Sequence, residues 1–379
     1  MNAPESTPSA VSFGPPSRTL MGPGPSNVAP RVLEALARPT VGHLDPTFVG
    51  LMDDVKGLLQ KTFRTDYPVT MPVSGPGTAG MQACVSNLVE PGDTVVVAVN
   101  GVFGGRLADM VRRVGGEAVV VEDAWGCPVD PSKIEAALDA HPNAKMVAFV
   151  HAETSTGAAS DAAAIAAIAR AHDCLTLVDT VTSLAGIPLE VGEWQLDAVY
   201  SGTQKCLSAP PGLSPVCFSP RAIDAIQARK TPVPSWFLDV SLVLGYWGDG
   251  AQRTYHHTAP INMIYALHES LIALHEEGLE SAWARHRAQH ERLRDGLDSL
   301  GLRLVVDAEH RLPQLNAVAI PDGVDDATVR RRLLDEHQLE IGAGLGPMAG
   351  KIWRIRLMGH TAREENVERA IRALGSVLQ

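Results

Sequence analysis

Short apolar runs, each ending abruptly in polar residues, alternate with Ala-rich or amphipathic stretches through most of the chain. Continuous apolar runs of this length are typical of strands buried on both faces, whereas the stretches between them have the length of helices. Helices are expected at Pro131–His141 and Asp161–His172. Strands are predicted at Thr94–Val99, Ala118–Val121, Met146–Val150, Leu175–Val178 and Ala198–Tyr200. Such alternation predicts an α/β fold with a mostly parallel sheet and helices on both faces.

The pattern changes near Leu279, where a long helix is expected over Glu280–Leu300. A further helix is expected near Ala327–His337, and strands near Leu302–Val306, Asn316–Ile320, Leu339–Ile341 and Ile352–Leu357. This mixture predicts a small α+β domain. The predicted division is therefore an N-terminal arm (1–19), a large domain (20–278) and a small C-terminal domain (279–379). The arm is rich in Pro and Ser without periodicity, so we expect it to be flexible.

The composition of the chain excludes several classes of function. The chain of 379 residues exceeds one ordinary core, and its formal charge of −11 argues against a nucleic-acid partner. No apolar run approaches the length of a membrane span. Five scattered cysteines indicate reduced thiols and not a disulfide framework. We therefore expect a cytoplasmic protein that binds neither nucleic acid nor membrane.

The candidate functional residues lie where two of the predicted strands end. The apolar run Leu175–Val178 stops at Asp179, and Ala198–Tyr200 leads into the polar cluster SGTQK, which ends in Lys205. A lone Asp at this place is often only a helix cap, and a lone Lys is usually a surface charge. Their combination favours pyridoxal phosphate, which needs a lysine amine, an acid near its ring nitrogen, and hydroxyl or amide donors for its phosphate.

Three other segments are expected at the same crevice. The turn SGPGT at 74–78 leads into a helix, whose N-terminus favours a phosphate, with Gly77 and Thr78 as contacts. An ordinary glycine loop capped by Thr78 is the alternative. Phe103 and Thr154 each follow a predicted strand end, as Asp179 does, so all three should face one cleft.

These motifs, taken in order, resemble the class V, fold-type I aminotransferases, most closely their alanine–glyoxylate and serine–glyoxylate branch. The resemblance runs from LMGPGPSN at 20–27 and SGPGT at 74–78, through NGVFG at 100–104 and ETSTG at 153–157. It continues through the segment from Asp179 to Lys205 and YHHT at 255–258 to GKIWRI at 350–355. It covers nearly the whole chain. The resemblance therefore implies a fold-type I enzyme that uses pyridoxal phosphate.

The resemblance also implies roles for residues around the cofactor. Lys205 would carry the cofactor covalently, and Asp179 would keep its ring nitrogen protonated. Phe103 would stack on the ring, and Thr154 would bring a hydroxyl near cofactor and substrate. Further cofactor contacts are expected from Gly77, Thr78, Val181 and Gln204. Tyr255 and Thr258 would reach the phosphate of the other subunit in a homodimer that shares its sites.

Substrate contacts are expected from Gly24, Thr154 and one arginine. The alternation along the last strand puts Arg354 and Arg356 on the same face, and an arginine fork suits a substrate carboxylate. Spacing does not choose between them. The family pattern implies Arg354, which leaves Arg356 at the surface or behind the site.

The function implied by the resemblance is transfer of an amino group to glyoxylate from alanine or serine, giving glycine and pyruvate or hydroxypyruvate. One alternative is a ureidoglycine–glyoxylate aminotransferase, although that branch favours an amide at the position of Tyr255. Another is a catalytically silent pyridoxal-phosphate-binding regulator, which would normally carry a DNA-binding domain. A cysteine desulfurase is excluded, because it needs a nucleophilic Cys in the small domain and none follows Cys217. No metal is expected, because His256 and His257 would point opposite ways in an extended segment.

Overall fold

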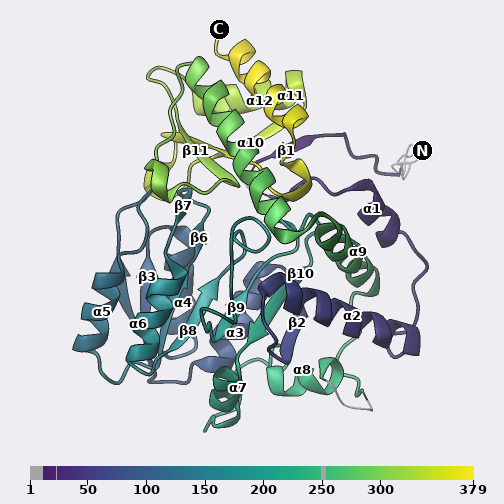
Figure 1. Ribbon diagram of the computed structural model, residues 1–379, viewed down its shortest axis with the longest axis vertical. Coiled ribbons are helices and arrows are strands. Elements are labelled where there is room, and N and C mark those ends of the chain that lie inside the picture. The colour runs from purple at the N-terminus through teal and green to yellow at the C-terminus, as the bar shows by residue number, and fades with distance from the viewer. Residues whose placement is uncertain (1–11, 23, 249–252) are drawn as a thin grey trace, which may run out of the picture.

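The computed structural model describes residues 12–22, 24–248 and 253–379, which form two lobes (Figure 1). Most of the predicted N-terminal arm lies outside these residues, and so does Pro23 of the GPGP turn. Each lobe is built on its own sheet, and a short two-stranded ladder of β6 (Ala152–Glu153) and β7 (Ala158–Ala159) lies beside them. No helix in the described ranges is both long and apolar enough to cross a membrane.

The lower lobe in Figure 1 contains a seven-stranded sheet. Its spatial order is β2 (Val69–Ser74), β10 (Leu213–Phe218), β9 (Ala198–Tyr200), β8 (Leu175–Asp179), β5 (Met146–Val150), β3 (Thr94–Val99) and β4 (Glu117–Glu122). All pairs from β9 to β4 are parallel, whereas β10 is antiparallel to both of its neighbours. The five strands expected from apolar runs are therefore present, each within one residue of its expected end. The apolar runs do not predict strands β2 and β10.

Helices cover both faces of this sheet. On one face α5 (Pro131–Ala140) and α6 (Ala162–Ala171) lie side by side (Figure 1). On the other, α3 (Gly77–Leu88) contacts α4 (Val102–Arg113) and α7 (Pro220–Gln227). The mostly parallel α/β architecture predicted from the sequence is thus confirmed.

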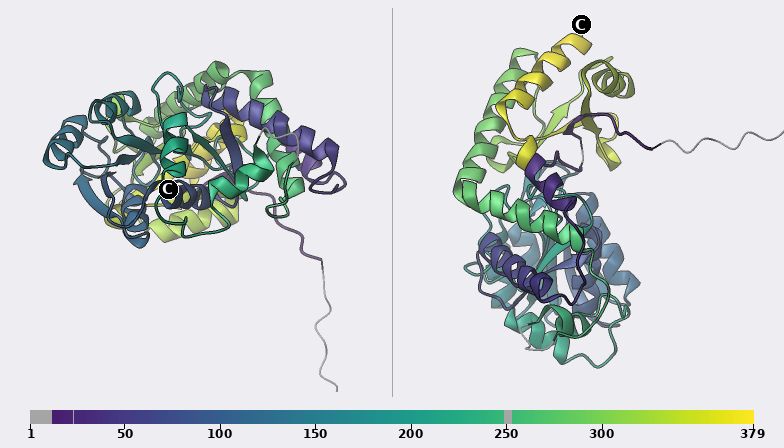
Figure 2. Two further views of the ribbon diagram at one scale, coloured as in Figure 1. Left: turned by 90° about the horizontal axis from the view of Figure 1, so that it is seen from below. Right: turned by 90° about the vertical axis from the view of Figure 1, so that its right-hand side faces the viewer.

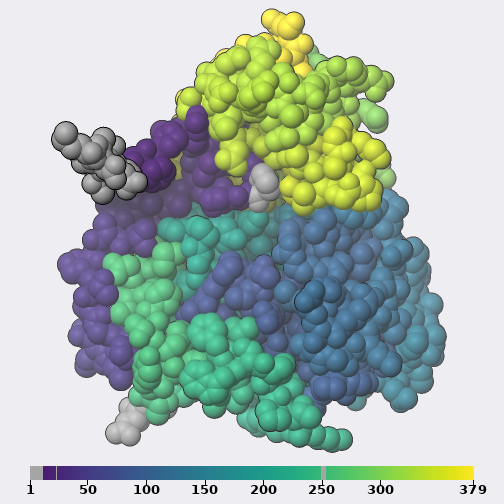
Figure 3. Space-filling model, turned by 180° about the vertical axis from the view of Figure 1, so that it is seen from behind, coloured from purple at the N-terminus to yellow at the C-terminus, as the bar shows by residue number. Residues whose placement is uncertain are grey.

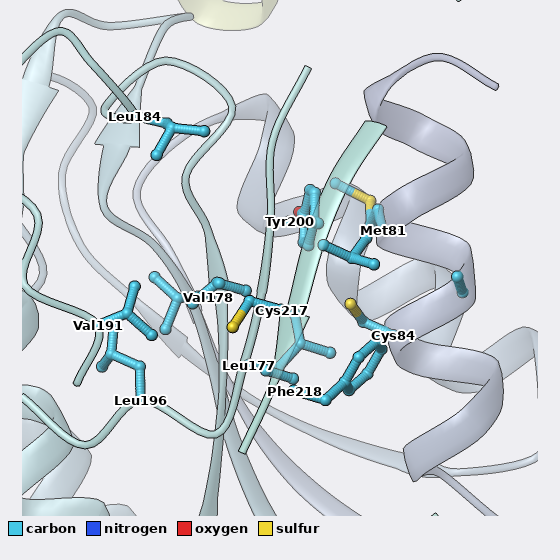
Figure 4. Close-up of a cluster of buried hydrophobic side chains, with 14 of the residues drawn as sticks. Met81, Cys84, Leu177, Val178, Leu184, Val191, Leu196, Tyr200, Cys217 and Phe218 are labelled. Carbon is cyan, nitrogen blue, oxygen red and sulfur yellow. The ribbon is translucent and has the colours of Figure 1, made fainter. Parts of the chain in front are cut away.

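The core beneath α3 shows how closely this helix approaches the sheet. Met81 and Cys84 of the helix meet Tyr200, Cys217 and Phe218 from β9 and β10, and all five side chains are buried (Figure 4). The close approach requires Gly80 in the helix, because a Cβ there would overlap the hydroxyl of Ser214 on β10. Close packing of this kind fixes the start of α3 relative to the ends of β8 and β9.

The upper lobe contains a four-stranded sheet in the order β1 (Thr19–Met21), β12 (Leu339–Ala343), β13 (Ile352–Arg356) and β11 (Leu315–Ala319). Three helices pack on it: α10 (Leu279–Ser299), α11 (Asp326–His337) and α12 (Glu364–Val377). The strand expected at Leu302–Val306 is wrong. That segment makes a single bridge between Leu304 and Val318, because Gly301 before it has a left-handed backbone and the chain turns away again at Asp307.

The two lobes are connected by the N-terminal segment and by the passage from α9 to α10. The N-terminal strand β1 pairs in parallel with β12 of the upper lobe, after which the chain enters α1 (Pro30–Leu36) and α2 (Pro46–Phe63) of the lower one. After the large sheet the chain forms two more helices, α8 (Val240–Trp247) and α9 (Ile261–Glu277). α9 packs on α1 and α2, and α10 then rises into the upper lobe (Figure 2). Seen from behind, the yellow-green lobe sits directly on the blue and teal one (Figure 3). The domain boundaries at 19 and 278 stay a prediction.

Candidate active site

Asp179 is the last residue of β8, at the carboxyl edge of the parallel strands. One oxygen, Oδ1, accepts a 2.8 Å hydrogen bond from the backbone N–H of Val181, and the other, Oδ2, accepts a 2.7 Å bond from the phenol of Tyr200 on β9. The side chain is 3% exposed. Burial raises the pKa of Asp179 to about 6, and the bond from Tyr200 opposes that rise. The carboxylate is thus fixed in orientation at the floor of a cleft.

Lys205 lies in the turn between β9 and β10. The N-terminal segment holds this turn from above, since Ser26 donates its hydroxyl to the Lys205 carbonyl at 2.8 Å and its N–H to the Gln204 carbonyl at 2.9 Å. The lysine is 8% exposed. Burial, and then the nearby charge of Arg356, lower the pKa of Lys205 to about 7. Near neutral pH, a large fraction of this amine is therefore an uncharged nucleophile and base.

The N-terminus of α3 opens onto the same cleft. The helix begins at Gly77, and no side chain caps its first N–H groups. Gly77 also lets the start of α3 lie close to Val181, because a Cβ at Gly77 would lie 3.2 Å from Cγ2 of Val181. Gln204 lines the same cavity, and the NH2 group of its side-chain amide is a hydrogen-bond donor. Unpaired helix N–H groups and a nearby amide suit a phosphate.

Phe103 and Thr154 reach the cleft from two neighbouring segments. Phe103 is the second residue of α4, and its N–H donates to the fully buried carboxylate of Glu153 at 3.1 Å. The guanidinium of Arg106 lies 5.0 Å from the Phe103 ring centre and donates to the Thr78 hydroxyl at 3.3 Å. Glu153 therefore fixes the entry of α4, and with it the aromatic ring.

These groups line a single cavity of about 270 Å³. Of the predicted cofactor contacts, the structure brings together Gly77, Thr78, Phe103, Thr154, Asp179, Val181, Gln204 and Lys205. A larger cavity of about 590 Å³ lies behind the Lys205 turn, against α9 and Arg285, but none of the predicted site residues lines it. The smaller cavity fits the predicted cofactor, because an amine, an acid, an aromatic ring and a helix N-terminus without a side-chain cap all face it.

Arg354 and Arg356 both lie at the junction of the lobes. Arg354 donates from Nε to the Ala343 carbonyl at 2.7 Å and from Nη1 to the Thr154 carbonyl at 3.1 Å. Arg356 is 2% exposed, so the alternative that it lies at the surface is wrong, whereas the alternative that it lies behind the site stays a prediction, since Arg356 is not among the residues that line the cavity. A Cβ at Gly24 would lie 3.0 Å from Nη2 of Arg356 and 3.1 Å from Nζ of Lys205. Only glycine fits between the two cations, and Gly24 also has a left-handed φ of 117°.

Tyr255 and Thr258 do not line the cavity of their own chain. Tyr255 is 59% exposed, and its ring lies 5.0 Å from that of His43. His256 and His257 do not point in opposite directions as expected, because the segment bends and Nδ1 of His256 lies 2.8 Å from Nδ1 of His257. Within the described ranges, no group of three or more His, Cys, Asp or Glu side chains could hold a metal ion.

Seven residues that line the cavity are not predicted as site residues by the sequence: Pro76, Met81, Arg106, Val150, Ala152, Thr182 and Tyr200. The pattern marks Tyr200 only as part of a strand, and Arg106 and Met81 only as parts of helices. The signal for Tyr200 is its place as the last residue of an apolar run, which puts its hydroxyl at the polar edge. Arg106 follows Phe103 by three residues, so both lie on one side of α4.

Comparisons with known proteins agree with this geometry. The family described as aminotransferase class-V matches residues 24–364. An alanine–glyoxylate aminotransferase of Felis catus is 40% identical over 96% of this chain and 88% of its own, and a (S)-ureidoglycine–glyoxylate transaminase of Bacillus subtilis is 38% identical over 96% and 91%. The crystal structure of an alanine–glyoxylate aminotransferase from Nostoc sp. is 47% identical, covers 98% of both chains and superposes with a TM-score of 0.96.

Proposed function

Because this chain belongs to the class V aminotransferases, which use pyridoxal phosphate, we propose that it transfers an amino group from alanine or serine to glyoxylate. The products would be glycine and pyruvate or hydroxypyruvate. The observation that carries the proposal is one small cavity that holds the Lys205 amine, the Asp179 carboxylate and the start of α3. Relatives named for alanine and glyoxylate support these substrates.

Different residues of this cavity would bind the phosphate, the ring and the ring nitrogen of the cofactor. Gly77, Thr78 and Gln204 would hold its phosphate, and Phe103 and Val181 would flank its ring. Asp179 would keep the ring nitrogen protonated. When bound, pyridoxal phosphate supplies a ring that withdraws electrons from the substrate Cα.

Lys205 and Arg354 act on the substrate. The amine of Lys205, whose pKa of about 7 leaves much of it neutral, can take a proton from the substrate Cα and return one in the reverse half-reaction. Arg354 is fixed by two backbone carbonyls and would bind the α-carboxylate. Thr154, whose carbonyl holds Arg354, would place its hydroxyl beside the substrate.

The partner subunit completes the site in this proposal. Tyr255 and Thr258 project from an exposed segment, with Tyr255 Oη 3.5 Å from Thr258 Oγ1, and would reach the phosphate of the other subunit in a homodimer. We also place the protein in the cytoplasm, since all five cysteines are free thiols.

A second candidate is transfer from (S)-ureidoglycine to glyoxylate, supported by the Bacillus subtilis relative. Tyr255 favours alanine or serine, because the ureidoglycine branch is expected to have an amide there. The experiment that separates them mixes the holoprotein with L-alanine, L-serine or ureidoglycine and follows the cofactor absorbance. Loss of the band with alanine or serine, restored by glyoxylate, supports the proposal. A response to ureidoglycine alone assigns the second function, and a protein without bound chromophore contradicts both.

A further inference from the structure

The two arginines of β13 present their guanidinium groups to the junction of the lobes. Trp353 and Ile355 point the other way and are fully buried in the core of the upper lobe. The alternation of side chains along a strand therefore turns Arg354 and Arg356 toward the lower lobe, where the cavity lies. Their contacts agree, since Arg354 meets Thr154 and Arg356 meets Gly22 and Gly24.

Each guanidinium is anchored separately. Arg354 uses carbonyls of Ala343 and Thr154, whereas Arg356 donates from Nε to the Gly22 carbonyl and from Nη1 to the sulfur of Met358 at 3.4 Å. Sulfur is a weak acceptor, so most of the donor capacity of Arg356 is not used by the protein. Two cations held in two different places can bind two different anionic groups.

Arg356 carries a buried charge that the protein does not balance. Its Nη2 is inaccessible to solvent and has no hydrogen-bond partner. Among the described residues, no carboxylate hydrogen-bonds to Arg356, and Glu340 contributes only a more distant attraction. Burying an unpaired cation costs several kcal/mol, so a protein retains one chiefly where a ligand supplies the counter-charge.

The position of this charge is close to the reacting atoms. Nη2 of Arg356 and Nζ of Lys205 lie 3.0 and 3.1 Å from the point where a Cβ of Gly24 would stand, so the two nitrogens are at most about 6 Å apart. An anionic group of a substrate held at Lys205 is therefore within reach of Arg356. With Arg354 assigned to the α-carboxylate, that group must be a second one.

We propose that Arg356 is a second substrate-binding arginine, which extends the amino donors of this site to dicarboxylic amino acids of the aspartate type. The inference rests on the proposed function, since it assumes amino transfer at Lys205. It predicts that the enzyme distinguishes aspartate from asparagine, which has nearly the same shape but lacks the second charge.

The test compares these two donors in single-turnover reactions of the holoprotein, followed by the cofactor absorbance. The wild-type protein should react with L-aspartate about 10- to 100-fold faster than with L-asparagine, as one charge-assisted hydrogen bond implies. Arg356→Met should bring the ratio close to one, whereas Arg113→Met, the same change at an exposed arginine of α4, should leave it as in the wild type. A wild-type ratio near one, or a ratio that survives Arg356→Met, overturns the inference.

A binding measurement gives a second readout that does not depend on turnover. Succinate should bind the holoprotein about 10-fold more tightly than succinamate, its uncharged monoamide, and Arg356→Met should remove this difference. Arg356→Lys keeps the charge and should retain part of the preference, which controls for a structural effect of the substitution. Equal binding of both ligands to the wild-type protein contradicts the inference.

If L-alanine and L-serine react but the ratio of the aspartate rate to the asparagine rate does not depend on Arg356, this inference alone fails. If neither L-alanine nor L-serine reacts, the proposed function fails.

Discussion

The phenol of Tyr200 donates a 2.7 Å hydrogen bond to Oδ2 of Asp179, across the adjacent ends of β9 and β8. The bond joins two buried strand ends, and it favours the ionised form of a carboxyl group, which burial disfavours. Tyr200 thus helps Asp179 to carry its charge at the place where the cofactor ring nitrogen is proposed to lie.

Replacing Asp179 by Asn should slow amino transfer. The rate of amino transfer should fall about 100-fold or more, because a neutral amide cannot stabilise a protonated ring nitrogen. Tyr200→Phe, which keeps the carboxylate, should reduce the rate much less. A single-turnover rate of Asp179→Asn within a few fold of the wild type would contradict the role of Asp179.

The stability of the cofactor-free protein should also depend on Asp179. Its folded pKa of about 6 lies above the ordinary value of 3.8, so the native state binds more protons than the unfolded state between these values. This contribution to stability is therefore lost as pH rises from about 4 to 6, by up to ~3 kcal/mol. Asp179→Asn should lack this loss. Urea unfolding of both proteins at several pH values measures the difference, and parallel profiles would contradict it.

The pKa of Lys205 predicts how fast the cofactor-free protein captures pyridoxal phosphate. Only the neutral amine is a nucleophile, so the capture rate should rise with pH through a midpoint near 7 and then level off. Arg356→Met removes a nearby positive charge that lowers this pKa, and should move the midpoint upward. Arg113→Met serves as the control and should not move it. A capture rate that does not change between about pH 6 and 8 would contradict this account.

The site can be predicted from the sequence largely because each strand end places its next polar residue at a common edge. That rule is sufficient to place Asp179, Phe103 and Thr154 at one cleft. It does not place Arg356, because alternation along a strand says which residues share a face but not whether that face meets solvent or another lobe. Only the packing of β13 against the lower lobe decides this, and it involves Gly24, more than 300 residues away in the chain.

The fold is predictable where apolar runs are continuous, and not where proline interrupts them. The strands β2 and β10 contain Pro72 and Pro215, which oppose each other in the antiparallel pair. Proline is rare inside sheets because it cannot donate to the ladder, so these runs do not indicate strands. The pairing is tolerated because the carbonyl of Pro215 faces β9, where it accepts a 2.8 Å bond from the N–H of Ser201, so the N–H that proline lacks would also face β9 and not β2.

Two adjacent glycines at the start of α4 should respond in opposite ways to alanine. A Cβ at Gly104 would lie 2.5 Å from the Ala98 carbonyl oxygen and 3.0 Å from Cα of Val99, and neither backbone atom can move easily. Gly104→Ala should therefore lower the free energy of unfolding by about 1–3 kcal/mol and weaken cofactor binding, since Phe103 precedes it. Gly105 has open space around it, so Gly105→Ala should stabilise by about 0.5–1 kcal/mol. Urea unfolding of both variants tests this, and equal effects would count against the packing argument.

A shared active site predicts that two impaired variants complement each other. A mixed dimer of Lys205→Ala and Tyr255→Ala subunits would contain one site with an intact Lys205 and an intact Tyr255 from the partner. Refolding the two proteins together should therefore recover up to a quarter of wild-type activity, since about half of the dimers are mixed and each has one complete site. Activity no higher than that of the separate variants would contradict a site built from both subunits.

The central claim, that Lys205 is the residue to which the cofactor is attached, can be tested directly. The holoprotein is reduced with borohydride, digested and analysed by mass spectrometry, with Lys205→Ala treated in parallel. The account predicts one reduced pyridoxal phosphate on the peptide that contains Lys205 and none on the variant. Label on another lysine, or equal label on the Lys205→Ala protein, would contradict it.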